Sequence, residues 1–247
     1  THKIISSALS EAFFNYFGYN PSPSEKGSWT NSLKCIKDVF LETGFHDHGI
    51  VLEYQLPLTS RRLDCMICGK DEKKQGNAVI IELKQWEKCK AGYSDKVVTW
   101  TGGGNREVLH PSVQVNNYKL YLENNHSVFY ESDPVSLSAC AYLHNYMKTP
   151  DDPLLAPQFI DYVSQCPIFY AEDFSQISRF LEKRLNAGDG MKVLDRVRES
   201  KQAPSRRFLT NVSKVIKEHK NYTLLDEQLV AYDKVITTVK SGLNDKQ

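Results

Sequence analysis

The spacing of apolar residues changes along the first part of the chain. An amphipathic stripe predicts a helix over residues 4–17, which ends at Gly18 and a run rich in proline and serine. A second stripe predicts a helix over residues 30–43, with Gly44 as its terminator. Residues 50–56 then alternate between apolar and polar side chains and end at a proline, which predicts a strand.

Two apolar strands with charged residues at their centres are predicted next. Residues 62–67 carry Asp64, and residues 78–86 carry Glu82 and Lys84. Side chains alternate across a strand, so Glu82 and Lys84 point to the same face. The polar run between the two strands is typical of a turn. The sequence therefore predicts an antiparallel hairpin in which Asp64 lies opposite Glu82.

Charged groups in the second of these strands have two explanations. Glu82 and Lys84 would lie on a solvated face if the sheet were open on one side. The apolar residues 79–81 are instead typical of a strand covered on both faces, where charges are rare unless they are paired or bound to a metal. Two neighbouring carboxylates repel each other, and a hard divalent cation removes that repulsion. We therefore expect Asp64 and Glu82 to hold Mg²⁺ or Mn²⁺.

The pattern after the hairpin predicts a loop, a helix and a strand. The long polar stretch contains three consecutive glycines, residues 102–104, and we expect a mobile loop near the site. Ser112 is expected to cap a helix, and Gln114 and Tyr118 then project together from one surface of that helix. Residues 135–142 alternate again and predict a further strand.

The C-terminal part of the chain is expected to be helical. An apolar stripe over residues 174–185 is bordered by basic side chains, and further helical patterns follow. We therefore expect a sheet-containing domain over residues 1–170 and a helical extension over residues 171–247. Basic residues of the extension would form either a patch that binds a nucleic-acid backbone or a solvated face, and their acidic neighbours favour the solvated face. These basic residues are Lys201, Arg206, Arg207, Lys214, Lys217 and Lys220.

Composition limits the classes of partner. The net charge is +1 over 247 residues, so an anionic partner must meet local patches and not a global field. Hydrophobic residues make up 40% and charged residues 25% of the chain, which is typical of a soluble globular protein. No apolar run approaches the roughly 20 residues that span a bilayer, and no signal-like segment opens the sequence. We expect a cytoplasmic protein with no membrane partner.

The six cysteines are scattered and lie mostly in apolar contexts, so we expect free thiols and no disulfide framework. Cys65 and Cys68 have the spacing of a metal-binding pair, but no second close pair exists. Two residues three apart on a strand also face opposite ways. A zinc or iron–sulfur site at these cysteines is therefore not expected.

The order of the charged and polar residues resembles the motifs of a known family. The set consists of Asp64, the tripeptide Glu82-Leu83-Lys84, and Gln114 with Tyr118 four residues later. It resembles the PD-(D/E)XK nuclease superfamily, in particular the RecB-like branch whose following helix bears Gln-x-x-x-Tyr. More closely, the chain is similar to the N-terminal nuclease part of bacterial nuclease–helicase fusions grouped with the schlafen-like ATPases. The resemblance implies an α/β (α+β) fold with a restriction-endonuclease-like core, in which helices flank a central mixed sheet and a helical extension follows.

The function that this resemblance implies is metal-dependent hydrolysis of DNA phosphodiester bonds, in phage defence or DNA processing. Asp64, Glu82 and the backbone carbonyl of Leu83 would hold the Mg²⁺ or Mn²⁺ ion. Lys84 would orient the attacking water and stabilise the negative charge that develops on the phosphate. The alternative role of Lys84 is a salt bridge to Glu82.

Gln114 and Tyr118 would act from the helix that follows. Gln114 would hydrogen-bond near the attacking water or the scissile phosphate, and Tyr118 would contact the phosphate or stack on a base. Ordinary helix packing is the alternative for both. A third carboxylate ligand would come from Glu53 or from Glu42, and the sequence does not decide between them.

One departure from the fusions limits the resemblance. Their helicase part begins with a glycine-rich Walker A loop, and these 247 residues contain none, so ATP hydrolysis by that route is excluded. We expect an excised nuclease portion or a stand-alone relative that meets double- or single-stranded DNA, with a helicase or ATPase module as a further partner. A catalytically inactive nucleic-acid-binding or docking module and an RNase on the same scaffold are the alternative functions.

Overall fold

The computed structural model describes residues 2–57, 59, 61–202, 234–235 and 237–238. Contacts between residues divide the chain into two units, Thr1–Ala203 and Pro204–Gln247. The four described residues of the second unit are helical. The sheets, their covering helices and the candidate site all belong to the first unit.

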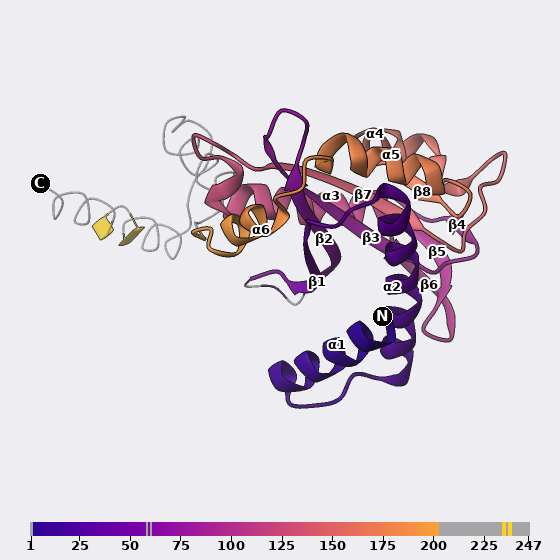
Figure 1. Cartoon of the computed structure of the whole chain (residues 1–247). Helices are drawn as coiled ribbons and strands as arrows, with labels where there is room; N and C mark the ends of the chain where they lie inside the picture. Colours follow the sequence, from indigo (N-terminus) through magenta and orange to yellow (C-terminus); the bar gives the residue numbers. More distant parts are fainter. Residues whose placement is uncertain (1, 58, 60, 203–233, 236, 239–247) are drawn as a thin grey trace, which may run out of the picture. The chain divides into compact units, whose positions relative to one another are not determined.

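The first unit is built around a mixed sheet of five strands (Figure 1). Strand β2 pairs antiparallel with both β1 and β3, and β7 and β8 continue the sheet parallel to β3. Helices cover this sheet, so the expected α/β (α+β) class with a central mixed sheet flanked by helices is confirmed. The order across the sheet is β1 (Gly49–Gln55), β2 (Arg62–Lys70), β3 (Gly76–Lys84), β7 (Ser136–Leu143) and β8 (Ile168–Tyr170).

Six α-helices and three short 3₁₀ helices are described. The α-helices are α1 (His2–Phe17), α2 (Pro23–Thr43), α3 (Pro111–Asn125), α4 (Ile160–Gln165), α5 (Phe174–Leu185) and α6 (Gly190–Arg198), and the 3₁₀ helices are η1 (Ser127–Phe129), η2 (Pro153–Leu155) and η3 (Pro157–Phe159). Among the described residues, no helix has the length and apolar composition needed to cross a membrane.

The helices form a layer on each face of the five-stranded sheet. Helices α3 and α6 pack on one face, where Met66 and Ile80 point. Helices α2 and α5 pack on the other face, which receives Ile67 and Val79. Alternating side chains of β2 and β3 therefore enter two separate cores, and the strands are covered on both sides as their apolar runs predict.

The hairpin of β2 and β3 has the predicted register. Paired residues run from Lys70 with Gly76 at the turn to Cys65 with Ile81 at the far end. Asp64 and Glu82 are the next residues on the two strands. The carboxylate of Asp71 stabilises the turn by accepting two backbone N–H groups of the loop that follows it.

The stretch that follows β3 is a sheet, so the expectation of a mobile loop is wrong. Three antiparallel strands form it: β4 (Cys89–Ala91), β5 (Lys96–Thr101) and β6 (Gly104–Leu109). Gly102 and Gly103 link β5 to β6 with φ values of 58° and 82°, which suit the two-residue turn of a tight hairpin. The glycines that suggested mobility therefore make the turn.

Two helix starts also differ from the expectation. Helix α2 begins at Pro23, earlier than residue 30, because Ser22 accepts a hydrogen bond from the Glu25 N–H at 3.1 Å and proline suits the first turn. Helix α3 is capped by His110, whose Nδ1 accepts from the Ser112 N–H at 3.2 Å, so Ser112 is not the N-cap. The predicted end of α2 at Gly44 is confirmed.

The C-terminal helices of the first unit pack directly on the sheet. Ile177, Leu181 and Leu185 of α5 are buried, as the apolar stripe predicts. Helices α5 and α6 thus lie in the same unit as the strands, and the division of the chain falls after Ala203, not near residue 170. Of the six basic residues considered for a patch, only Lys201 is described, and the other five lie outside the described residues.

All six cysteines are free thiols, as expected. Cys65 and Cys68 belong to the cores on opposite faces of the sheet. Burial raises the pKa of the Cys68 thiol to about 12, so this side chain is an uncharged packing residue at neutral pH. The structure therefore agrees with the prediction that these two cysteines do not form a metal site.

The close approach of α6 to β1 and β2 gives a test of the packing. A Cβ on Gly190 would lie 2.2 Å from the Gly49 nitrogen and 2.3 Å from the Cys68 carbonyl oxygen. We expect Gly190→Ala to lower the free energy of unfolding by about 1–3 kcal/mol, because backbone atoms must move apart. Gly27→Ala on helix α2 is the control, since its Cβ meets nothing within 4 Å. Urea denaturation followed by circular dichroism measures both, and equal stabilities would contradict the packing described.

Candidate active site

The backbone hydrogen bonds between β2 and β3 end just before Asp64, whose side chain takes the place of a backbone acceptor. The last registered pair is Cys65 with Ile81. Beyond it, Oδ2 of Asp64 accepts a hydrogen bond from the Leu83 N–H at 2.7 Å. The carboxylate thus satisfies a backbone donor that the neighbouring strand no longer meets. This contact holds Asp64 against the chain segment that carries Glu82 and Lys84.

A hydrogen-bonded network connects β3 with helix α3. The Lys84 ammonium lies 2.6 Å from Oε1 of Glu82 and donates to Oε1 of Gln114 at 3.1 Å. The Gln114 amide donates to Oε1 of Glu82 at 2.7 Å and to the Tyr118 hydroxyl at 2.9 Å. The structure therefore brings together Asp64, Glu82, Lys84, Gln114 and Tyr118, the five side chains that the sequence singled out, as well as the backbone of Leu83.

The two acids of the network compete for a proton. The Glu82 side chain is only 2% exposed, and burial together with the nearby Asp64 carboxylate raises the pKa of Glu82 to about 8. Burial also raises the pKa of Asp64, although the Lys84 charge and the Leu83 N–H oppose this. Near neutral pH the pair therefore retains a proton that a cation would displace.

Lys84 remains positively charged in spite of its position. Burial would lower the pKa of this ammonium group, but the charges of Glu82 and Asp64 outweigh burial and raise the pKa above its ordinary value. The amine therefore cannot accept a proton near neutral pH. What it can provide is a fixed positive charge and hydrogen-bond donors beside the two acids.

Of Glu53 and Glu42, Glu53 is the acid that lies near Asp64. In the register of β1 with β2, Glu53 lies opposite Asp64, between the registered pairs on either side of it. Burial, then the charge of Asp64, raise the pKa of Glu53 to about 7. The backbone of Glu53 has φ 51°, a left-handed conformation that is uncommon for a residue with a side chain. Glu42 is exposed on helix α2.

The oxygen atoms of this region are of the kind that bind a small hard cation. Oε2 of Glu82 is buried and has no hydrogen-bond partner among the residues that the structure describes. A cavity of about 50 Å³ is lined by Glu53, Asp64, Leu83 and residues of α1, β1 and α2, which is room for an ion or a few waters. No group of three or more histidine, cysteine or acidic side chains in the described part of the chain is close enough to hold a metal. Carboxylates of Asp64 and Glu82 with a backbone carbonyl of Leu83 are the donor set that Mg²⁺ prefers, completed by water.

A second opening leads to the network from the other side. A pocket of about 310 Å³ is lined by Arg61, Gln114 and Tyr118, together with the last residues of β6. Arg61 is exposed and brings a positive charge to this pocket. A guanidinium there can bind an anionic group. Strand β6, which the sequence did not predict, forms one wall.

Gln85 and His110 support the site through contacts with other elements. Their positioning roles could not be predicted from the sequence. The Gln85 amide donates to the Ser28 hydroxyl at 2.8 Å, which links the end of β3 to helix α2. His110 is fully buried, stacks on Phe159 with ring centres 4.0 Å apart, and bonds through Nε2 to the Leu154 carbonyl at 3.0 Å. His110 therefore positions the start of α3 and does not line the pocket.

Comparison of the chain with protein-family models, with curated proteins and with solved structures finds no match. Two adjacent buried acids, one protonated amine and an amide can bind a divalent cation and an anionic group at the same place. That combination is suited to reactions in which negative charge develops on a phosphate.

The raised pKa of Glu82 predicts how stability depends on pH when divalent ions are removed. Between about pH 5 and pH 8 the folded protein binds a proton at Glu82 that the unfolded chain has released, so the free energy of unfolding falls as pH rises through this range. The slope from this group is at most about 1.4 kcal/mol per pH unit.

Urea denaturation in EDTA at several pH values measures this slope. Glu82→Gln should flatten it, because glutamine does not titrate. Glu107→Gln is the matched control, since Glu107 is an exposed acid that pairs with Lys96 on the neighbouring strand. An unchanged slope in Glu82→Gln would show that Glu82 is ionised in the folded protein.

Proposed function

We propose that this protein is a metal-dependent nuclease that hydrolyses DNA phosphodiester bonds on a PD-(D/E)XK core. The observation that carries the proposal is the meeting of Asp64, Glu82 and Lys84 at the end of the β2–β3 hairpin. Gln114 joins them from the helix that follows in the chain. These are the residues, in this order, that the family motif requires.

The order of elements supports the same proposal. Helix α2, strands β1 to β3, helix α3 and strand β7 follow one another as helix, three strands, helix and strand, which is the series expected for the family core. The small sheet β4–β6 is placed between β3 and α3. It adds a wall to the pocket beside Gln114 and Tyr118 without separating the motif residues.

Each side chain has a role that its surroundings favour. Asp64, Glu82 and the Leu83 carbonyl would hold Mg²⁺ or Mn²⁺, which when bound lowers the pKa of water and offsets phosphate charge. The Lys84 ammonium stabilises the negative charge that develops on the phosphate oxygens. Gln114 fixes the Lys84 and Glu82 side chains relative to each other through its amide.

The remaining roles concern the substrate. Tyr118 and Arg61 line the same pocket as Gln114, so a phosphate group that enters there meets a hydroxyl and a guanidinium. A helicase or ATPase module acting with this chain, and a role in phage defence or DNA processing, are further parts of the proposal that rest on the resemblance alone.

Substitution of Lys84 tests the proposal directly. We expect Lys84→Ala to lower the rate of DNA cleavage in Mg²⁺ or Mn²⁺ by at least about 100-fold, since it removes a charge that acts in the transition state. Asp64→Ala should have at least the same effect. Lys96→Ala on the exposed face of β5 is the control and should cleave at the wild-type rate.

Gel assays on linear, circular and single-stranded DNA and on RNA separate the alternatives. Cleavage of RNA alone would make the protein an RNase on the same scaffold. Binding of DNA without cleavage by the wild type, in either metal, would make it a binding or docking module.

Calorimetric titration with Mn²⁺ tests the ligands. We expect Asp64→Asn to abolish binding and Glu53→Gln to weaken it on the order of ten-fold, because Glu53 lines the cavity beside Asp64. Glu42→Gln removes an exposed acid from helix α2 and should bind as the wild type does. Binding should also release protons, which titrations in two buffers of different ionisation enthalpy reveal. Equal affinities for Glu53→Gln and Glu42→Gln would remove Glu53 from the site.

A further inference from the structure

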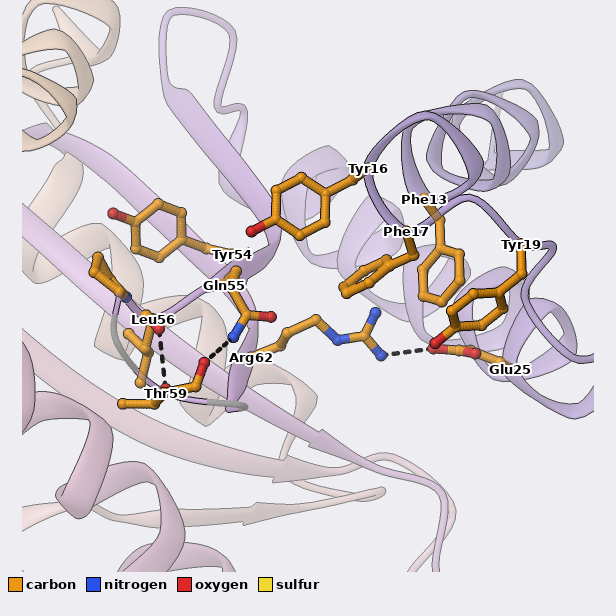
Figure 2. A pocket seen from close by; sticks show the side chains of 11 residues that line it. Phe13, Tyr16, Phe17, Tyr19, Glu25, Tyr54, Gln55, Leu56, Thr59 and Arg62 are labelled. Atoms are coloured by element: carbon orange, nitrogen blue, oxygen red, sulfur yellow. Dashed lines mark hydrogen bonds and ion pairs between the residues drawn. The ribbon is translucent and has the colours of Figure 1, made fainter.

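A pocket rich in aromatic side chains lies beside the candidate active site. It has a volume of about 780 Å³, within the range of small-molecule sites. Figure 2 shows Phe13, Tyr16 and Phe17 on the side of α1, and Tyr54 and Gln55 on the side of β1. None of these residues takes part in the network around Glu82. The pocket is therefore a separate feature of the molecule.

Three of the aromatic rings that line the pocket are exposed. Tyr16 is 72% exposed, and Phe17 and Tyr19 are also exposed. These rings contact one another, with centres 4.7 Å apart for Tyr16 and Phe17 and 4.5 Å apart for Phe13 and Phe17. Figure 2 shows the Tyr16 ring projecting from α1 toward Tyr54. A flat ring entering the pocket would meet aromatic surface from both sides.

The charges of the pocket favour a neutral occupant. Arg62 is its cation, and it pairs with Glu25 at 2.6 Å and with Glu53 at 3.4 Å. One positive charge against two acids leaves no excess to attract a phosphate or an acidic peptide. The Gln55 amide and the tyrosine hydroxyls supply uncharged hydrogen-bond groups. Aromatic faces with polar edges match a nucleobase, which has a flat apolar face and a rim of donors and acceptors.

The pocket is continuous with the surroundings of the catalytic acids. A neighbouring cavity of about 240 Å³ shares Tyr16, Phe17 and Arg62 with it and also includes Glu53. Glu53 in turn lies opposite Asp64 and lines the small cavity beside that acid. A nucleotide whose base occupied the aromatic pocket would thus belong to a strand that passes close to Asp64.

We infer that the aromatic pocket binds an unpaired nucleobase of the strand on which the active site acts. This inference rests on the proposed nuclease function and names its substrate class: nucleic acid with a single-stranded segment or end. Base stacking on exposed rings is tolerant of sequence, so the pocket selects for an unpaired base and not for a particular one. A blunt duplex, whose bases are all stacked and paired, would leave the pocket empty.

Binding without cleavage tests the assignment on the full chain. In EDTA, a DNA duplex with a short single-stranded overhang that carries 2-aminopurine is titrated with protein, since the fluorescence of this base falls when it stacks. The competitors are the blunt duplex and a duplex whose overhang carries abasic sites. The abasic overhang keeps every phosphate but lacks the bases. We expect quenching, and affinity for the base-bearing overhang on the order of ten-fold above that for the abasic one.

Substitutions of Tyr16 locate the effect. Tyr16→Ala should lower the affinity for the base-bearing overhang on the order of ten-fold and leave that for the abasic overhang unchanged. Tyr16→Phe keeps the ring and should retain the wild-type affinity. Tyr93→Ala is the control, because Tyr93 is 86% exposed and lies outside the pocket.

The possible outcomes separate this inference from the proposed function. Equal affinity for base-bearing and abasic overhangs, or no quenching, overturns the base-binding assignment. If Tyr16→Ala changes the sedimentation coefficient but quenches 2-aminopurine as the wild type does, the pocket serves self-association, and the base-binding assignment is overturned as well. If the wild type quenches the base but cleaves no nucleic acid in Mg²⁺ or Mn²⁺, the nuclease proposal fails while the pocket assignment stands.

Discussion

The burial of two carboxylates and one ammonium group at the end of the β2–β3 hairpin is the constraint on which the rest of this structure depends. Charged groups removed from water are costly unless neighbours compensate them. Here the Leu83 N–H bonds to Asp64, and the Lys84 ammonium and the Gln114 amide both bond to one oxygen of Glu82. The other oxygen of Glu82 has no hydrogen-bond partner in the described part of the chain. An arrangement that leaves this oxygen unsatisfied is poorly explained by stability and well explained by a ligand.

Several structural features serve to hold this cluster. The His110 cap fixes the first turn of α3 and thereby the direction of Gln114. Gln85 ties the end of β3 to α2, so the last residues of the strand keep their position after the ladder has ended. The sheet β4–β6 closes one side of the pocket at Gln114. The site is thus supported from three directions, which is what a fixed arrangement of charges requires.

Features set by local pattern could be predicted from the sequence, and features set by tertiary contacts could not. Alternation within β2 and β3 predicted the hairpin, the position of Asp64 opposite Glu82 and the shared face of Glu82 with Lys84. The strands after β3 were missed because their alternation uses short polar residues such as Thr99, and because glycines at a tight turn resemble those of a loose one. That Glu53 and not Glu42 lies near Asp64 follows from the register of β1 against β2, which no short-range pattern contains.

A local irregularity in the sheet links the candidate active site to the aromatic pocket. Leu52 and Cys65 point to the α2 and α5 face, whereas Tyr54 and Leu63 point to the face of α3 and α6. Leu52 and Tyr54 are two residues apart on β1, and Leu63 and Cys65 are two residues apart on β2, so regular alternation would place each pair on one face. The alternation is therefore interrupted at the residue between them on each strand. On β1 that residue is Glu53, whose left-handed backbone accounts for the interruption. On β2 it is Asp64. The same irregularity that sets these two acids side by side therefore also turns the next pair, Gln55 and Arg62, toward the rings of helix α1.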